Sequence, residues 1–243
     1  MMELQDGEVH VWRWDLDREA ARPVLLLEDE QARVERFHFE PDARRWAVCR
    51  TLLRVTLGRY LALAPESLKF TLGPWGKPGL RGCPLRFSVS HSGGVALLAV
   101  AWRREVGVDL ESISRVLFPE ELAPQVLSQR EQAWLRDQAP EQREAAFLTL
   151  WTAKEAYVKA TGQGLSFPLT RLTLLPKRAG NQFEASQIVS LCPIYVCRLD
   201  AGPDHLAAVA LEGAPAAVRY LDPLNFDPPN SAAEFAWSGR KLR

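Results

Sequence analysis

The chain has 243 residues, of which 47% are hydrophobic and 25% are charged, a composition that suits a compact globular protein with a substantial core. Its 30 basic and 30 acidic residues balance, so the net charge creates no field that would gather nucleic acid or an anionic membrane. Four dispersed cysteines without a C-x-x-C pair argue against a disulfide framework or a zinc site, and no apolar run approaches the ~20 residues of a membrane span. Because the N-terminal segment lacks the apolar core of a signal peptide, we expect a cytoplasmic protein.

The first half of the chain predicts a strand, a long helix and a meander of strands. Residues 8–15 favour a strand and residues 28–39 a charged helix, and Asp42 is a candidate N-cap for a helix that runs to about residue 62. Strands are predicted over residues 68–72, 86–90 and 95–102. One face of the long helix is apolar and should be buried. Arginines occupy the other side: Arg44, Arg45, Arg50, Arg54 and Arg59.

The second half repeats this order of elements. Residues 106–111 favour a strand, Ser128 and Glu131 form a capping-box pattern, and residues 140–161 favour a long helix that Gly162 ends. Strands are predicted near residues 171–175, 194–199 and 205–211.

This repetition predicts an α+β fold of two pseudo-symmetric subdomains, each a long helix packed on a mostly antiparallel sheet. We expect the subdomains at residues 1–104 and 105–221. The Pro-rich, aperiodic residues 222–243 should form an extended or disordered tail.

The strand Gly107-Val-Asp109-Leu-Glu111 carries two carboxylates at alternate positions. Alternation places Asp109 and Glu111 on one face of the strand, and their mutual repulsion calls for a positive group between them. A bound cation would meet that need. The alternative is an exposed strand with an ordinary polar face.

The predicted helix at residues 140–161 carries Trp151, Glu155 and Lys159 at i, i+4 and i+8, along one stripe. A Glu–Lys pair at this spacing is often only a solvated surface pair. Here the stripe continues to Leu148 and Gly162, so the acid and the base share a face with apolar residues. A solvated pair normally lies opposite the apolar stripe, and this placement therefore favours a functional site.

Two further segments could contact an anion. In FSVSHSGG (residues 87–94), Ser90 and His91 point apart on a strand and the G-x-S-x-G elbow of a serine hydrolase is absent, but both side chains can donate to a phosphate. A histidine that caps a hairpin is the alternative. The turn at residues 76–78, GKP, lacks the spacing of a Walker loop and presents Lys77, which could equally be a solvated lysine.

Together and in this order, GKP (76–78), FSVSHS (87–92), GVDLE (107–111) and WTAKEAYVK (151–159) resemble the motifs of the Sfp-type 4′-phosphopantetheinyl transferase superfamily. The family patterns are G-K-P, F-N-[ILV]-S-H-S, G-[VI]-D-[IVL]-E and W-x-x-K-E-[AS]-x-x-K. The resemblance covers roughly residues 8–211, and the two α+β subdomains of that family match the repeat described above. Two positions differ, since Ser88 stands where the family has Asn, and Glu30 where it often has Lys.

The resemblance implies Mg²⁺-dependent transfer of the 4′-phosphopantetheine arm of coenzyme A (CoA) to a serine of an apo acyl or peptidyl carrier protein, with release of adenosine 3′,5′-bisphosphate. It implies that Asp109, Glu111 and Glu155 hold the Mg²⁺. Glu155 would act as the general base for the carrier serine, and Lys159 would stabilise the leaving pyrophosphate.

Contacts to CoA are also implied, from residues in both halves of the chain: Arg33, Arg45, Lys77, Ser90, His91 and Lys159. We expect a monomer that binds neither nucleic acid nor membrane and contacts its carrier through an apolar loop near residues 119–126. A non-catalytic relative that only binds CoA or carrier is the main alternative, and a metal-dependent phosphohydrolase is another. The sequence does not identify the carrier.

Overall fold

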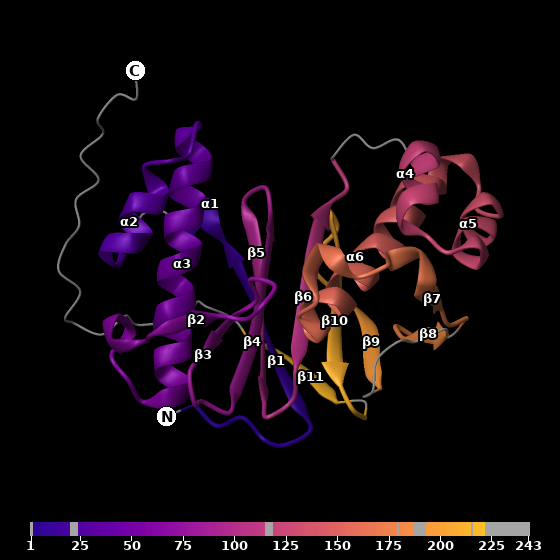
Figure 1. Cartoon of the computed structure of the whole chain (residues 1–243). Coiled ribbons are helices and arrows are strands. Elements are labelled where there is room, and N and C mark those ends of the chain that lie inside the picture. Colours follow the sequence, from indigo (N-terminus) through magenta and orange to yellow (C-terminus); the bar gives the residue numbers. More distant parts are fainter. Residues whose placement is uncertain are drawn as a thin grey trace. The chain divides into compact units, whose positions relative to one another are not determined.

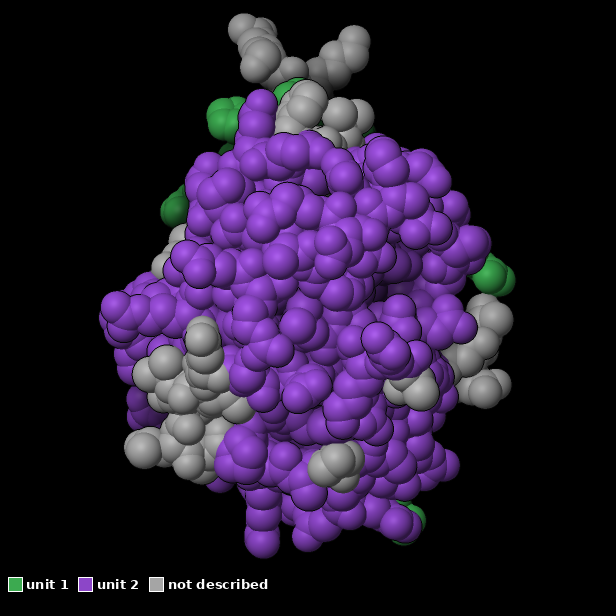
Figure 2. Space-filling view, turned by 90° about the vertical axis from the view of Figure 1, so that its right-hand side faces the viewer, with its two compact units in different colours: residues 1–3, 14–68, 222–243 green, residues 4–13, 69–221 purple. Residues whose placement is uncertain are grey.

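The computed structural model describes residues 2–19, 24–114, 119–178, 180–186, 193–214 and 216–221 (Figure 1). These residues form two compact units that interleave along the chain, coloured separately in Figure 2. Unit 1 contains the described residues of 2–3 and 14–68, and unit 2 those of 4–13 and 69–221. These units do not coincide with the two subdomains expected from the sequence, residues 1–104 and 105–221. That division into subdomains stays a prediction. The expected tail at residues 222–243 lies outside the described residues.

Unit 1 is helical in its described part, with α1 (Leu16–Glu19), α2 (Glu28–Val34), α3 (Glu40–Leu61) and the 3₁₀ turn η1 (Pro65–Ser67). Helices α1 and α2 both pack against α3. The prediction of Asp42 as the N-cap is wrong, because α3 begins after Phe39 with Pro41 in its first turn. Proline suits that turn, where the backbone N–H groups have no intrahelical acceptor. Helix α2 is also shorter than predicted.

Arg54 corrects the expectation that the arginines of α3 all lie on an exposed side. Its side chain is only 2% exposed and forms an ion pair with Glu30 of α2, Nη2 to Oε1, at 2.8 Å. The same guanidinium donates to the carbonyl oxygens of Pro65 and Leu68, each at 3.0 Å. A buried charge is tolerated when its partners satisfy it, and Glu30 supplies that partner here.

Unit 2 contains two main sheets. The first has the strand order β11-β1-β5-β4, from β1 (Glu8–Asp15), β4 (Leu85–Ser92), β5 (Val95–Trp102) and β11 (Ala217–Leu221). The second, antiparallel sheet has the order β6-β10-β9, from β6 (Val106–Ser112), β9 (Ile194–Leu199) and β10 (His205–Glu212). Two short hairpins pair β2 (Phe70–Leu72) with β3 (Pro78–Leu80), and β7 (Thr173–Pro176) with β8 (Phe183–Ser186).

The helices of unit 2 are α4 (Pro119–Val126), α5 (Gln129–Arg136) and α6 (Arg143–Thr161), with 3₁₀ turns η2 (Pro140–Gln142), η3 (Gly164–Ser166) and η4 (Leu169–Arg171). The predicted capping box is confirmed, because Ser128 accepts from the Glu131 N–H while the Glu131 carboxylate accepts from the Ser128 N–H. Gly162 ends α6 in the left-handed region, at φ 69°, as predicted.

Side chains along β6 alternate between two faces, so its apolar residues lie on one face and its two carboxylates on the other. Val108 and Leu110 belong to one hydrophobic cluster, which they share with residues of β1, β5, β9 and β10. On the opposite face of β6, Gly107 and Asp109 lie against α6, and alternation puts Glu111 on the same face. Figure 1 shows α6 beside β6. An α+β fold with a long helix on an antiparallel sheet is therefore confirmed for α6 and the β6-β10-β9 sheet.

Most predicted strands are present within a residue or two of their expected ends. Strand β11 was missed; it pairs in parallel with β1 from Glu8↔Ala217 to Trp12↔Leu221. The expected carrier-binding loop is the helix α4, in which Leu122 and Val126 pack against the core and the side chains of Glu120 and Glu121 are exposed. None of the helices in the described residues is long and apolar enough to cross a membrane.

Candidate active site

Gly107 allows α6 to cross directly over β6. A Cβ atom at this position would lie 2.0 Å from the carbonyl oxygen of Ala156 and 2.4 Å from the nitrogen of Ala160, distances that no packed side chain tolerates. Only glycine fits beneath the helix here. The close approach brings the helix residues Glu155 and Lys159 to the carboxylate face of β6.

A hydrogen-bonded triangle lies where β4, β6 and α6 meet. The ammonium of Lys159 donates to Asp109 Oδ1 at 2.6 Å and to Ser90 Oγ at 3.0 Å, and the Ser90 hydroxyl donates to the same Asp109 oxygen at 2.8 Å. Asp109 is 5% exposed, whereas the Lys159 side chain keeps 30% of its surface in solvent. The triangle therefore joins a buried anion to a cation that a ligand can reach.

Burial and mutual repulsion perturb the acids of this site. Burial raises the pKa of Asp109 above its ordinary value; Lys159 and Ser90 oppose the shift, and Glu111 adds to it. The pKa of Glu155 is raised too, first by burial and next by the charge of Asp109, with a smaller contribution from Glu111. The pKa values of Asp109 and Glu155 thus respond to negative charge nearby, as expected of groups in one site.

The fit of these residues to a divalent cation can be tested on the donor atoms. Within the described part of the chain, no three His, Cys, Asp or Glu side chains are grouped as a ready-made metal site. However, Asp109 Oδ2 is buried and has no hydrogen-bond partner among the described residues. An orphaned carboxylate oxygen beside two further carboxylates is a hard donor set of the kind that Mg²⁺ accepts. The residue types fit the cation, although the side chains are not gathered around one point.

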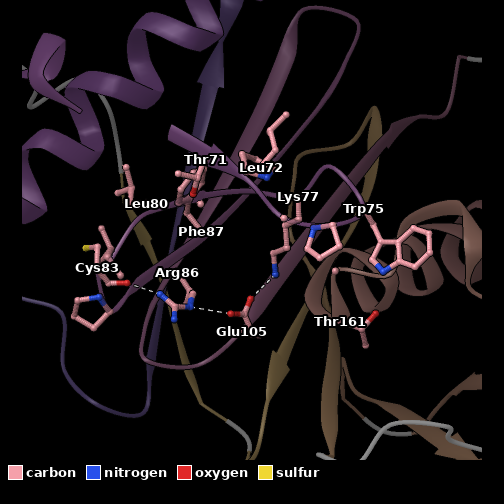
Figure 3. Close-up of a pocket in the computed structure, with 18 of the residues that line it drawn as sticks. Thr71, Leu72, Trp75, Lys77, Leu80, Cys83, Arg86, Phe87, Glu105 and Thr161 are labelled. Atoms are coloured by element: carbon pink, nitrogen blue, oxygen red, sulfur yellow. Dashed lines mark hydrogen bonds and ion pairs between the residues drawn. The ribbon is translucent and has the colours of Figure 1, made fainter. Parts of the chain in front are cut away.

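Lys77 is held by protein acceptors rather than solvated. Its ammonium donates to Glu105 Oε2 at 2.6 Å, to the Val106 carbonyl at 3.1 Å and to the Ala160 carbonyl at 3.0 Å. Arg86 donates to the other oxygen of Glu105 at 2.8 Å. Lys77, Arg86 and Glu105 line a pocket of about 750 Å³, in which Figure 3 shows Lys77 and Arg86 pointing to Glu105. A contact of Lys77 with CoA stays a prediction.

A second pocket, of about 330 Å³, reaches the triangle. Glu155 and Lys159 line it together with apolar side chains from the GKP turn, α6 and the segment after it, among them Trp75, Val158 and Phe167. A ligand in this pocket can therefore reach Glu155 and Lys159, the acid and the base predicted from the sequence of α6. The mixture of a few polar groups with apolar walls is typical of a small-molecule site.

The remaining predicted contacts fall outside the triangle. His91 follows Ser90 on β4 with its side chain exposed. Arg33 and Arg45 belong to unit 1, where the Arg45 guanidinium pairs with Asp17 at 2.8 Å and Arg33 lies over the ring of Trp46, 5.2 Å from its centroid. Their roles toward CoA stay predictions.

Two features of the site were missed by sequence reasoning. Ser92 donates to Glu111 Oε2 at 3.2 Å. The predicted strand ended at residue 90, whereas β4 runs to Ser92, and the alternation continued past Ser90 was the signal that could have found this residue. Lys154, next to Glu155, is fully buried and pairs with Glu131 at 2.7 Å. No local pattern distinguishes such a lysine from an exposed one, because its partner comes from another helix.

Two family models match the chain. One describes the 4′-phosphopantetheinyl transferase superfamily and matches residues 105–210; the other describes the N-terminal part of 4′-phosphopantetheinyl transferases and matches residues 13–103. Together they span both halves of the sequence.

Relatives of known name give the same assignment. The 4′-phosphopantetheinyl transferase HetI of Nostoc sp. is 39% identical over 171 residues, which cover 67% of this chain and 72% of that protein. The 4′-phosphopantetheinyl transferase psf-1 of Bacillus pumilus is 34% identical over 208 residues, covering 80% and 88%. The 4′-phosphopantetheinyl transferase Sfp of Bacillus subtilis is 26% identical over 186 residues, covering 76% and 81%.

Among solved structures, the holo-[acyl-carrier-protein] synthase of Thermotoga maritima aligns with 45% of this chain and 62% of its own, at 19% identity and a TM-score of 0.38. This structural similarity is too weak to support a statement about function. The family models and the sequence relatives are sufficient by themselves: the chain belongs to the 4′-phosphopantetheinyl transferase superfamily, and it is a transferase.

Proposed function

We propose that this protein transfers the 4′-phosphopantetheine arm of CoA to a serine of an apo acyl or peptidyl carrier protein in a Mg²⁺-dependent reaction. The observation that carries the proposal is the meeting of Asp109, Glu155 and Lys159 beside a pocket, in a chain of the 4′-phosphopantetheinyl transferase superfamily. The products would be the holo-carrier and adenosine 3′,5′-bisphosphate.

Asp109, Glu111 and Glu155 would hold the Mg²⁺. The ion, when bound, would neutralise negative charge on the pyrophosphate of CoA. The buried, partnerless Oδ2 of Asp109 and the repulsion among the three carboxylates support this assignment, because both features are relieved by a cation.

Glu155 would act as the general base. The hydroxyl oxygen of the carrier serine attacks the β-phosphorus of CoA, a new P–O bond forms, and the bond from that phosphorus to the bridging oxygen breaks. The serine proton passes to the Glu155 carboxylate, directly or through one water, and adenosine 3′,5′-bisphosphate departs with the bridging oxygen. Glu155 suits this task by position, because its side chain lines the same pocket as Lys159, where the serine hydroxyl would enter.

Lys159 would stabilise the charge that develops on the leaving group. An ammonium has three N–H donors, of which two serve Asp109 and Ser90 in the described structure. The third can reach a phosphate oxygen from the exposed side of the residue. Ser90 and Asp109 thereby orient the ammonium before CoA arrives, which lowers the cost of reorganisation during the reaction.

The proposal is tested by incubating the full chain with CoA and a panel of apo-carriers, with MgCl₂ or with EDTA, and measuring the intact mass of each carrier. We expect at least one carrier to gain a single phosphopantetheine group in MgCl₂ only. No modified carrier across fatty-acid, polyketide and peptide types would reject the transfer. Equal rates in EDTA and MgCl₂ would reject the metal requirement. Hydrolysis of CoA without a carrier would indicate a phosphohydrolase instead.

We further propose that the protein acts as a monomer in the cytoplasm and docks its carrier near α4. The exposed Glu120 and Glu121 of that helix argue against a purely apolar contact there. Light scattering coupled to gel filtration tests the oligomeric state. Kinetics against the carrier panel would show which type the protein prefers.

A further inference from the structure

Three serines occupy alternate positions on β4, and all three contact β6. Strand β4 is the edge of the first sheet of unit 2 and β6 is the edge of the second, and the two strands are neighbours in different sheets. Ser88, Ser90 and Ser92 therefore face the gap between two strand edges. We call these three residues the serine ladder.

Each rung of the serine ladder has its own partner on β6. The Ser88 hydroxyl accepts from the Val108 N–H at 3.1 Å, and the Ser90 hydroxyl donates to Asp109 at 2.8 Å. The Ser92 hydroxyl accepts from the Ser112 N–H at 3.0 Å and donates to Glu111 Oε2 at 3.2 Å.

The rungs replace hydrogen bonds that a continuous sheet would make. Edge strands present unpaired N–H groups, and burial of such a group without an acceptor is costly. A serine hydroxyl accepts and donates at once, so one rung can satisfy a backbone N–H and also hold a carboxylate. Ser92 does both, and it thereby fixes the Glu111 carboxylate relative to the backbone of β6.

We propose that Ser92 is a positioning residue that directs the Glu111 carboxylate toward the site of Asp109 and Glu155. Ser88 joins the strands without holding a carboxylate, because its partner on β6 is a backbone N–H. The functional consequence of this inference rests on the proposed function, since a misdirected Glu111 would weaken cation binding. The geometric statement, that Ser92 holds Glu111 in place, is independent of it.

The test compares Ser92→Ala with the matched control Ser88→Ala and the conservative variant Ser92→Thr. Binding of Mn²⁺ is titrated by electron paramagnetic resonance, and the MgCl₂ concentration for half-maximal transfer is measured alongside. We expect Ser92→Ala to weaken both about 10-fold, the usual effect of removing a group that orients a metal ligand. Ser92→Thr should restore both values. Ser88→Ala should lower Tm and leave both values unchanged.

Two outcomes would overturn the proposal. One is Mn²⁺ binding in Ser92→Ala equal to that of the wild type; the other is an equal loss in Ser88→Ala, which would indicate general loosening of the strands. If the wild type neither binds Mn²⁺ nor needs Mg²⁺, the metal part of the proposed function fails instead. Crystal structures of the wild type and Ser92→Ala then decide the inference: a displaced Glu111 carboxylate in the variant supports it, and an unmoved one refutes it.

Discussion

Gly107 sets the distance between α6 and β6, and with it the geometry of the site. We predict that Gly107→Ala pushes the helix away from the strand, because the new Cβ would overlap the backbone of Ala156 and Ala160. A displacement of about 1 Å at a catalytic group can cost roughly 10²-fold in rate. Transfer kinetics and thermal unfolding measure the effect, and both should be impaired.

Gly79→Ala is the control for the loss of a glycine. A Cβ at that position meets only the Thr71 hydroxyl, at 3.9 Å, which is ordinary contact. Its Tm should stay close to that of the wild type. A Gly107→Ala variant with wild-type rate and Tm would contradict the close packing described here.

Glu155 makes the metal-free protein less stable as the pH rises. Its pKa in the folded chain lies above the ordinary value of 4.5, so the folded chain holds the proton more tightly than the unfolded chain does. The stability that this carboxyl contributes is complete below pH 4.5 and is lost as the pH rises through the folded pKa. Asp109 shifts in the same direction.

We therefore predict that Glu155→Gln raises the Tm of the protein in EDTA at pH 8 while it abolishes transfer and retains CoA binding. For a chain of this size, relief of about 1 kcal/mol of repulsion corresponds to roughly 2–4 °C. Calorimetry and CoA titration provide the measurements. Glu141→Gln, which removes the same charge from an exposed position, should change Tm by about 1 °C or less. Transfer by Glu155→Gln at the wild-type rate would refute the role of general base.

At the scale of elements, the Glu131–Lys154 pair joins helices α5 and α6 to the strand region that follows them. Both side chains are fully buried, and the Lys154 ammonium also donates to the carbonyls of Leu169 and Leu172 at 2.7 and 2.6 Å. The Glu131 carboxylate accepts from the Leu174 N–H at 2.8 Å. A network this complete immobilises the turn of α6 that carries Glu155.

We predict that Lys154→Met costs about 3–5 kcal/mol in the free energy of unfolding, because it leaves the Glu131 carboxylate buried without its cation. Adding Glu131→Gln to the same chain should recover part of that loss. Urea unfolding of the two single variants and the double variant gives the coupling free energy between the residues. Strictly additive losses would show that the pair does not act as a unit.

Periodic patterns explain what could be predicted of the elements. Alternation revealed the strand with Asp109 and Glu111, and the i, i+4 spacing revealed Glu155 and Lys159, because both sets lie within one element. The capping box and Gly162 were visible for the same reason. Arg54 was misplaced because helical periodicity grouped it with exposed arginines, whereas its burial depends on Glu30 of another helix.

The features that the sequence did not predict depend on contacts between distant segments. The Lys77 ammonium is held by Glu105 and by the carbonyl of Ala160 near the end of α6. No local sequence pattern links Lys77 to either of these residues. Strand β11 was missed because residues 217–221 have no strong alternation of their own and gain their strand from β1. The composition of a short edge segment does not reveal a partner at the other end of the chain.

At the scale of the whole molecule, the predicted CoA contacts divide between the units. Arg45 lies in unit 1, where its bidentate pair with Asp17 holds the guanidinium at an exposed position. We predict that Arg45→Ala raises KM for CoA about 10-fold and leaves kcat nearly unchanged, because a group that binds substrate and transition state equally affects KM alone. Steady-state kinetics with varied CoA provide the measurement.

The variant Asp17→Ala distinguishes a direct contact of Arg45 with CoA from a purely structural role of the Arg45–Asp17 ion pair. It removes the ion pair and keeps the arginine, and exposed ion pairs of this kind contribute little to stability. An unchanged or lower KM for CoA in Asp17→Ala supports a direct role of Arg45. A rise in KM equal to that of Arg45→Ala would show that the pair matters only for local structure.

The parallel pairing of β1 with β11 has a consequence for protein synthesis. Residues 8–12 are translated long before their hydrogen-bonding partners at residues 217–221. At about 5–20 residues per second, the nascent strand waits roughly 10–40 s with one edge unpaired. During that interval its apolar Val9 and Val11 are available to other nascent chains. Added chaperone capacity should therefore improve the yield of folded protein more than a stronger promoter does.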